Sequence, residues 1–480
     1  MVEASKVLDE SIAKNFVCIG LNWDGDALVV GMMDTLDKTE IQARTKEIAA
    51  ATGLKIKHQA VPEALLREVI EISYSQVSGV DFSAPAKFKG NSDGPIAELV
   101  NNVLDRAVRM RASDVHIEPT EDDLVIRIRV DGLLEEMTRL PGATAASFVS
   151  RLKVLSRLDI VERRRPQDGQ FSITLATRKI DVRLATVATL YGEKIVLRLL
   201  DTKKQMVGLS ELGMSDENLE KFQRLISSQH GLVITAGPTG SGKTTTLHSA
   251  VKTLNSPFRN VSTLEDPVEY VVPGVNHITV NESIGTGFSV QLRAILRQDP
   301  DIVLVGEMRD SETARIGVQA ALAGRLVLTS LHATDVVGVI YRLFQMGIEP
   351  YLVAASLRGV VAQRLIRRCC AFCSQEAEMN AADRLLLKHY TKDTRKVQVK
   401  YGAGCTICRG TGFLDRVGAY QIFEISDEMR ELISTRPNPS EIYELAEEEG
   451  LRTLADEAFD LVLAGKTTLS EATSVIGTDV

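Results

Sequence analysis

The sequence predicts a multidomain α/β protein, and three observations carry this prediction. A run of apolar, largely β-branched residues at 231–236 precedes a glycine-rich loop and a helical stretch, as in a buried parallel strand followed by its helix. Strands and helices then alternate to about residue 365. A separate stretch at 96–200 combines an amphipathic helix with strands of alternating polarity, which indicates an α+β domain.

Length and composition set the expected number of domains. The chain has 480 residues, of which 44% are hydrophobic and 25% are charged, as in an ordinary globular protein. At about 150 residues per domain, we expect roughly three domains. The predicted divisions are an N-terminal domain at 1–74, a flexible linker at 75–95, the α+β domain at 96–200, a second linker at 201–213, the α/β core at 214–365, a cysteine-containing subdomain at 366–424 and a C-terminal helical region at 425–480.

The elements before the core are predicted from periodicity and turn residues. Apolar residues at helical spacing indicate amphipathic helices, and alternating polarity indicates half-buried strands. Ser, Gly, Pro, Lys and Asp dominate the first linker, which favours flexible chain there. The predicted elements are helices at 62–74 and 96–107 and strands at 114–118, 124–130, 180–187 and 194–200.

Charge and hydropathy argue against several classes of protein. The formal net charge is −8, so no overall basic excess favours a nucleic-acid partner. No apolar run reaches the roughly 20 residues of a membrane span. The first residues carry Glu3, Asp9 and Glu10 and lack the apolar core of a secretory signal. We therefore expect a cytoplasmic protein that is peripheral to a membrane only through partners.

The glycine-rich loop from Gly237 to Thr244 matches the phosphate-binding pattern G-x-x-x-x-G-K-S/T in full. Its glycines let backbone N–H groups approach phosphate oxygens, and the following helix adds its positive dipole end. Lys243 is expected to reach the β- and γ-phosphates of ATP, and the Thr244 hydroxyl to bind Mg²⁺. The predicted nucleotide-binding residues are Gly237, Pro238, Thr239, Gly240, Ser241, Gly242, Lys243, Thr244 and Thr245.

Two acidic segments follow strand-like runs and are candidates for the hydrolytic machinery. The run 302–307 has the form of a Walker B strand and ends in Glu307, although Gly306 occupies the usual aspartate position. Glu307 is therefore expected to act on Mg²⁺ directly or through water. A second cluster, at 263–269, follows the strand-like run 260–264 and ends in Glu269.

These segments, together with 292–301, 306–310 and Leu331-His332-Ala333, resemble the secretion traffic ATPases, the hexameric motors of type II secretion and type IV pilus assembly. The resemblance runs from about Ile96 to the C-terminus. It implies a RecA-like ATPase core and a PAS-like second domain, with ATP bound between them in a homo-hexamer. It also implies an N-terminal domain that docks on a partner of the membrane machine.

The resemblance assigns roles to individual acidic and imidazole groups. Glu269 matches the glutamate that polarises the attacking water, and Glu307 matches the Walker B glutamate. The family's histidine box usually holds two histidines, but here Arg325 stands at the first position and only His332 is retained. His332 is expected either to sense the γ-phosphate or to hold its loop.

Arg183 and Arg198 lie on two predicted strands of the second domain. An arginine on a strand is commonly part of a solvated or salt-bridged face. Both residues, however, match family positions that point toward nucleotide. A cation delivered in trans stabilises the charge of phosphoryl transfer, so we interpret Arg183 and Arg198 as arginine fingers.

Five of the six cysteines are clustered near the C-terminus. Two Cys-x₂-Cys pairs, Cys370/Cys373 and Cys405/Cys408, predict a closed four-thiolate site for structural Zn²⁺. Cys369 adjoins the first pair and could replace Cys370 as a ligand, although the paired spacing favours Cys370. In the resembling family, secretion and pilus-extension motors carry such an insert, whereas retraction motors generally lack it.

The overall hypothesis is a hexameric ATPase motor that acts on an inner-membrane platform protein and docks on a further cytoplasmic or membrane protein. The sequence leaves open whether it serves type II secretion or pilus extension. Three alternatives also stay open. These are a nucleic-acid motor such as a hexameric helicase or translocase, a conjugation-type secretion ATPase, and a nucleotide-gated scaffold without turnover.

Overall fold

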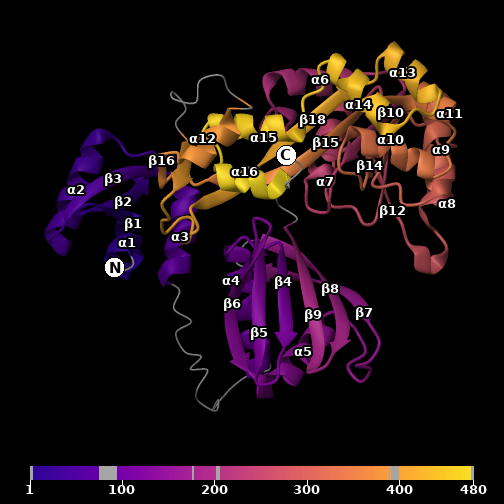
Figure 1. The fold of residues 1–480 in the computed structure, drawn as a ribbon. Coiled ribbons are helices and arrows are strands. Elements are labelled where there is room, and N and C mark those ends of the chain that lie inside the picture. Colours follow the sequence, from indigo (N-terminus) through magenta and orange to yellow (C-terminus); the bar gives the residue numbers. More distant parts are fainter. Residues whose placement is uncertain are drawn as a thin grey trace. The chain divides into compact units, whose positions relative to one another are not determined.

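The computed structural model describes residues 4–74, 94–175, 178–201, 206–388, 390 and 399–476. Most of the predicted first linker, and residues 202–205 of the second, lie outside these described residues. The chain divides into two compact units. Figure 1 labels their helices and strands. Unit 1 comprises Met1–Lys204, Cys370–Gln375 and Gly402–Asp415, and unit 2 comprises Gln205–Cys369, Glu376–Tyr401 and Arg416–Val480.

Unit 1 begins with a small three-stranded sheet in the order β1-β2-β3. β1 and β2 are antiparallel, whereas β2 and β3 are parallel and are connected through a crossover helix, α2. Helix α3 buries Leu66, Val69 and Ile70. The elements are α1 (Glu10–Phe16), β1 (Cys18–Asp24), β2 (Ala27–Met33), α2 (Lys38–Thr52), β3 (Lys55–Val61) and α3 (Glu63–Tyr74).

The second sheet of unit 1 has six strands in the order β6-β5-β4-β9-β8-β7, with antiparallel neighbours. Alternate residues of β5, such as Leu124, Ile126 and Ile128, are buried in a core that also includes residues of α4 and α5. The elements are α4 (Pro95–Arg109), β4 (Asp114–Pro119), β5 (Asp123–Val130), β6 (Leu133–Pro141), α5 (Ala145–Leu155), β7 (Gln167–Leu175), β8 (Arg178–Thr189) and β9 (Gly192–Asp201).

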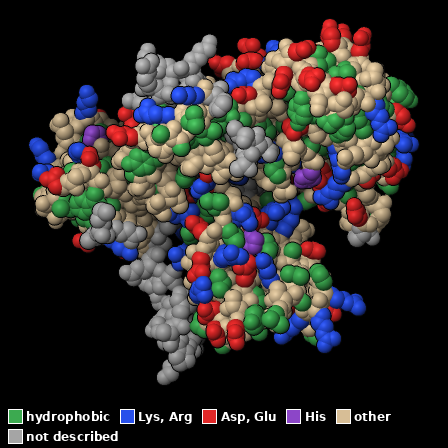
Figure 2. Space-filling model, in the orientation of Figure 1, with side chains coloured by type: hydrophobic (Ala, Val, Ile, Leu, Met, Phe, Trp, Pro, Cys, Tyr) green, Lys and Arg blue, Asp and Glu red, His purple; other side chains and the backbone are tan. Residues whose placement is uncertain are grey.

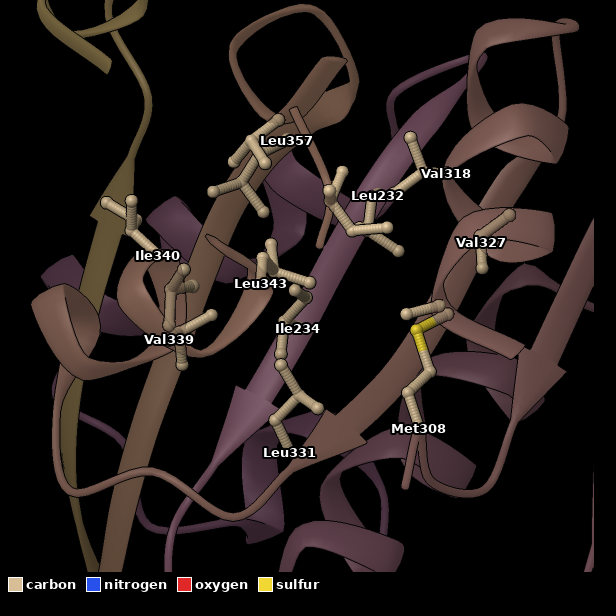
Figure 3. Close-up of a cluster of buried hydrophobic side chains, with 14 of the residues drawn as sticks. Leu232, Ile234, Met308, Val318, Val327, Leu331, Val339, Ile340, Leu343 and Leu357 are labelled. Atoms are coloured by element: carbon tan, nitrogen blue, oxygen red, sulfur yellow. The ribbon is translucent and has the colours of Figure 1, made fainter. Parts of the chain in front are cut away.

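Unit 2 is built on a seven-stranded sheet in the order β12-β11-β13-β14-β10-β15-β18. Both faces are covered, because Leu232 and Ile234 of β10 belong to one apolar core while Val233 belongs to another. Figure 3 shows part of the first core. The strands are β10 (Gly231–Ala236), β11 (Val261–Glu265), β12 (Asn276–Thr279), β13 (Ile302–Val305), β14 (Leu326–Leu331), β15 (Leu357–Cys369) and β18 (Phe413–Glu424).

Helices flank this sheet (Figure 1), so unit 2 confirms the α/β class predicted from the alternation of strands and helices. The main helices are α6 (Asp216–Ile226), α7 (Lys243–Leu254), α8 (Phe288–Ile295), α9 (Ser311–Leu322), α10 (Val336–Gln345), α11 (Pro350–Ser356), α13 (Asp427–Ser434), α14 (Pro439–Glu448), α15 (Leu454–Leu463) and α16 (Leu469–Ile476). A two-stranded sheet of β16 (Ser374–Ala377) and β17 (Val399–Gly402) and the short helix α12 (Ala381–Leu387) complete the chain.

The surface carries both signs of charge. In Figure 2, basic and acidic side chains are interspersed on the visible face. None of the described helices is long and apolar enough to cross a bilayer.

Candidate functional site

The phosphate-binding loop lies between β10, which ends at Ala236, and α7, which begins at Lys243. Gly237 has φ +149°, and a Cβ there would lie 2.5 Å from Ser241 Oγ and 2.6 Å from the carbonyl oxygen of Gln363. Gly242 precedes α7 with φ +91° and has no side chain to cap the helix. The first N–H groups of α7 are therefore left for an anion.

Lys243 is folded over this loop. Its Nζ donates hydrogen bonds to the carbonyl oxygens of Gly237 (2.7 Å) and Pro238 (3.0 Å). Burial lowers the pKa of Lys243, while the negative charge of Glu307 opposes that shift. Thr244 and Thr245 follow in the first turn of α7, both half-buried. The loop thus presents an ammonium group and open amides at one point.

Glu307 and His332 lie at the same edge of the sheet as this loop. β10, β13 and β14 are parallel, so their carboxyl ends meet there. Glu307 follows β13 and His332 follows β14, with Glu307 Oε2 3.7 Å from His332 Nε2. Glu307 also forms an ion pair with Arg309. The fold of unit 2 therefore brings together Lys243, Glu307 and His332.

The second acidic segment reaches this edge as well, because β11 is parallel to β13. Glu265, the last residue of β11, is only 3% exposed. Asp266 and Glu269 follow in the connection to β12, and both are exposed. The acidic cluster is thus divided into one buried carboxylate and two accessible ones.

Polar residues outside the sequence motifs also contact the phosphate-binding loop. Gln363, which is 1% exposed, donates from Nε2 to the carbonyl oxygen of Ser241 (2.7 Å). Arg416 Nη1 donates to the carbonyl oxygen of Gly240 (3.4 Å). Burial lowers the pKa of Arg364, and its charge also lowers the pKa of Lys243. In the sequence, Gln363 and Arg364 are marked only as a polar pair that directly follows the apolar run 360–362.

Arg183 and Arg198 are directly opposed on neighbouring strands, β8 and β9. Cross-strand partners point to the same face of a sheet, so the two guanidinium groups share one face. Arg198 Nε lies 3.1 Å from Asp114 Oδ1, while 56% of its side chain stays exposed. Both arginines belong to unit 1 and the phosphate-binding loop belongs to unit 2, so neither unit by itself joins them.

Four buried thiols come together in unit 1. The Sγ atoms of Cys370, Cys373, Cys405 and Cys408 all lie within 4.8 Å of one another. The Cys370–Cys405 and Cys373–Cys408 distances are 3.8 Å, and the Cys405–Cys408 distance is 3.7 Å. A tetrahedral site with Zn–S bonds of about 2.3 Å has S–S edges of about 3.8 Å. The donor set and its spacing therefore fit Zn²⁺.

The structure separates the two candidates for the first ligand. Cys370 belongs to the thiol cluster, whereas Cys369 Sγ lies 3.9 Å from the carbonyl oxygen of Lys400. Backbone N–H groups of Cys405 (3.2 Å) and Gly412 (3.3 Å) donate to Cys408 Sγ, as expected around a thiolate. A closed four-sulfur shell leaves no position for a substrate, so such a site is structural.

Comparison with known families decides the identity of the chain at family level. Residues 89–474 match the family model described as type II/IV secretion system protein. The chain belongs to this family. The match confirms the resemblance predicted from the sequence motifs.

Named relatives of this type II/IV secretion system protein are similar over most of its length. It is 43% identical to the type II secretion system protein HxcR of Pseudomonas aeruginosa over 377 residues, covering 78% of this chain and 76% of that protein. It is 37% identical to the type IV pilus assembly ATPase PilB of Myxococcus xanthus over 486 residues, covering 97% of this chain and 85% of that protein. The Legionella pneumophila ATPase DotB shares the fold, with a TM-score of 0.58 at 20% identity, covering 81% of this chain and 96% of DotB.

This member of the type II/IV secretion system protein family is an ATP-hydrolysing enzyme. In its Walker B segment, Gly306 occupies the usual aspartate position, and the structure gives a physical reason. The N–H of Gly306 donates to the carbonyl oxygen of Leu264 (2.8 Å), and a Cβ at this position would lie 3.3 Å from that oxygen. Glycine relieves this tight approach between β13 and β11. Position 306 therefore carries no carboxylate, and the segment offers that of Glu307 instead.

Proposed function

We propose that the chain is the hexameric ATPase motor that powers type IV pilus assembly or type II secretion. The observation that carries the proposal is the shared sheet edge, where Lys243, Glu307 and His332 lie beside the loop that holds Glu269. Relatives named for both processes support the wider role. On this proposal the protein is cytoplasmic. It is peripheral to the inner membrane through a platform protein and a docking protein.

The site suggests a division of roles during ATP hydrolysis. The amides of the loop and Lys243 neutralise the β- and γ-phosphates. Thr244 and Glu307 would hold Mg²⁺, directly or through water, and the bound ion would neutralise charge that develops on the γ-phosphate. Glu269 orients the attacking water. His332, next to Glu307, registers the γ-phosphate or holds its loop.

Lys243→Ala tests the proposal. We expect a loss of at least about 10²- to 10³-fold in steady-state ATPase activity, because the substitution removes a preorganised cation from the transferring phosphate. Lys252→Ala is the matched control. Lys252 lies on the same helix, away from the phosphate-binding loop, and its Nζ donates to the carbonyl oxygen of Met206 (3.1 Å), so activity should be retained. Wild-type turnover by Lys243→Ala would end the proposal.

The four-thiol cluster is proposed to hold structural Zn²⁺. The second Cys pair also contacts the N-terminal sheet, because the N–H of Thr406 donates to the carbonyl oxygen of Leu21 (3.0 Å) and its hydroxyl to that of Gly20 (2.6 Å). Four thiolates crowded in one buried cluster require a cation to offset their charge. Metal loss is therefore expected to destabilise this part of unit 1.

Cys370→Ser and Cys369→Ser distinguish ligand from neighbour. Cys370→Ser should lose most of the one zinc expected per chain and melt at a lower temperature, since metal binding energy is folding energy at such sites. Cys369→Ser should keep its zinc because Cys369 lies outside the cluster. Elemental analysis and thermal unfolding make the measurement. Equal zinc loss in both variants would contradict the assignment.

A further inference from the structure

We infer that Glu265, His248 and His277 form a largely buried positioning network that fixes the loop bearing Glu269 relative to the phosphate-binding helix. The inference rests on the proposed role of Glu269 in orienting water. The three residues come from β11, α7 and β12, and none of them belongs to the phosphate-binding pattern. Their contacts link the two segments that must cooperate in hydrolysis.

The first link joins β11 to the phosphate-binding helix. His248 lies five residues after Lys243 on α7, and its side chain is 1% exposed. Its Nε2 is 2.8 Å from Glu265 Oε2. The ring of Tyr270 lies 5.3 Å from the His248 ring, tilted by 57°. Tyr270 directly follows Glu269, so this contact joins α7 to the acidic loop as well.

The second link holds the acidic loop from its other side. The N–H of Val272 donates to His277 Nε2 (3.0 Å), which makes that nitrogen an acceptor. The ring proton of His277 therefore resides on Nδ1, which lies 2.8 Å from Thr263 Oγ1 and 3.5 Å from Glu265 Oε1. Val272 is three residues after Glu269. The position of His277 thus determines where this part of the loop lies.

Glu265 remains an anion at the centre of the network. Burial alone would raise the pKa of Glu265, but the hydrogen bond and charge of His248, aided by the nearby polar groups of Thr263 and His277, outweigh burial and lower it. Its carboxylate faces two imidazoles inside the domain and is nearly inaccessible to solvent. Glu265 is therefore a positioning residue, whereas the exposed Glu269 is the group available to water.

The test compares two substitutions of His277 in the full-length protein. Glutamine places an amide oxygen near the position of Nε2 and can still accept from Val272, whereas asparagine is too short. We expect His277→Asn to lower kcat about 10- to 100-fold with the KM for ATP unchanged, because a displacement of about 1 Å costs this much. His277→Gln should restore most of the wild-type kcat. The inference is overturned if His277→Asn leaves kcat unchanged, or if it raises the KM for ATP instead of lowering kcat.

A double-mutant cycle with Glu269→Gln separates positioning from a general structural role. If the network acts through Glu269, His277→Asn should lower the residual kcat of Glu269→Gln no further. If the losses in kcat of the two substitutions multiply, the inference is overturned. Wild-type turnover by Glu269→Gln alone overturns instead the proposed role of Glu269 in orienting water. If His277→Asn does not assemble, Tyr270→Leu tests the same loop. It should lose about 10-fold in kcat at constant KM, and a wild-type kcat there would again contradict the network.

Discussion

Glu269→Gln should lower kcat for ATP hydrolysis by about 10²- to 10⁴-fold, the range for losing a positioned proton acceptor. Glutamine keeps the shape of the side chain and removes its charge, so the affinity for Mg²⁺-ATP should change little. Glu269 lies in an exposed loop, so the fold does not depend on burying its side chain. Single-turnover hydrolysis and nucleotide titration measure the two effects separately.

Glu312→Gln is the matched control for this experiment. Glu312 is an exposed acid of α9 that pairs with Arg293 at 2.8 Å, and surface pairs of this kind contribute little. Its kcat should stay close to wild type. A normal kcat in Glu269→Gln would contradict the role of Glu269 and would mean that another group at this sheet edge activates the water.

The phosphate-binding loop was predictable because its chemistry is local. The motif requires close backbone approach at glycine, a cation and a helix start within a few residues, and all of these are consecutive in the sequence. The α/β class was predictable for a similar reason, since strands buried on both faces are continuously apolar. The roles of Glu269, Arg183, Arg198 and His332 in hydrolysis remain predictions.

The supporting contacts were not predictable because they join residues far apart in the chain. Gln363 contacts Ser241 across 122 positions, and His248 contacts Glu265 across 17. A histidine in a helix pattern shows only which face it occupies, not which carboxylate it will meet. For the same reason, the paired spacing favoured Cys370 over Cys369 as the zinc ligand but could not decide between them. The two cysteines are adjacent in sequence, and only the fold separates their sulfur atoms.

Arg183→Ala and Arg198→Ala should each lower kcat by about 10³-fold or more, the effect of removing an arginine finger. The guanidinium groups share one face of the sheet, and the contact between Arg198 and Asp114 orients Arg198 while leaving it largely exposed. Arg139→Ala is the matched control. Arg139 lies on β6 of the same sheet and pairs with Glu136 at 2.9 Å, so its loss should leave turnover nearly unchanged.

Mixed assemblies distinguish a finger supplied by a neighbouring subunit from one that acts within its own chain. Arg198→Ala chains keep an intact phosphate-binding loop, and Lys243→Ala chains keep intact arginines. Where the two kinds of chain meet in a hexamer, one can supply the cation and the other the bound ATP. Turnover of the mixture should therefore rise well above the sum of the separate proteins. If differently tagged chains co-purify and the mixture stays inactive, supply in trans is contradicted, because the complementary parts would then be present at shared interfaces without forming a working site.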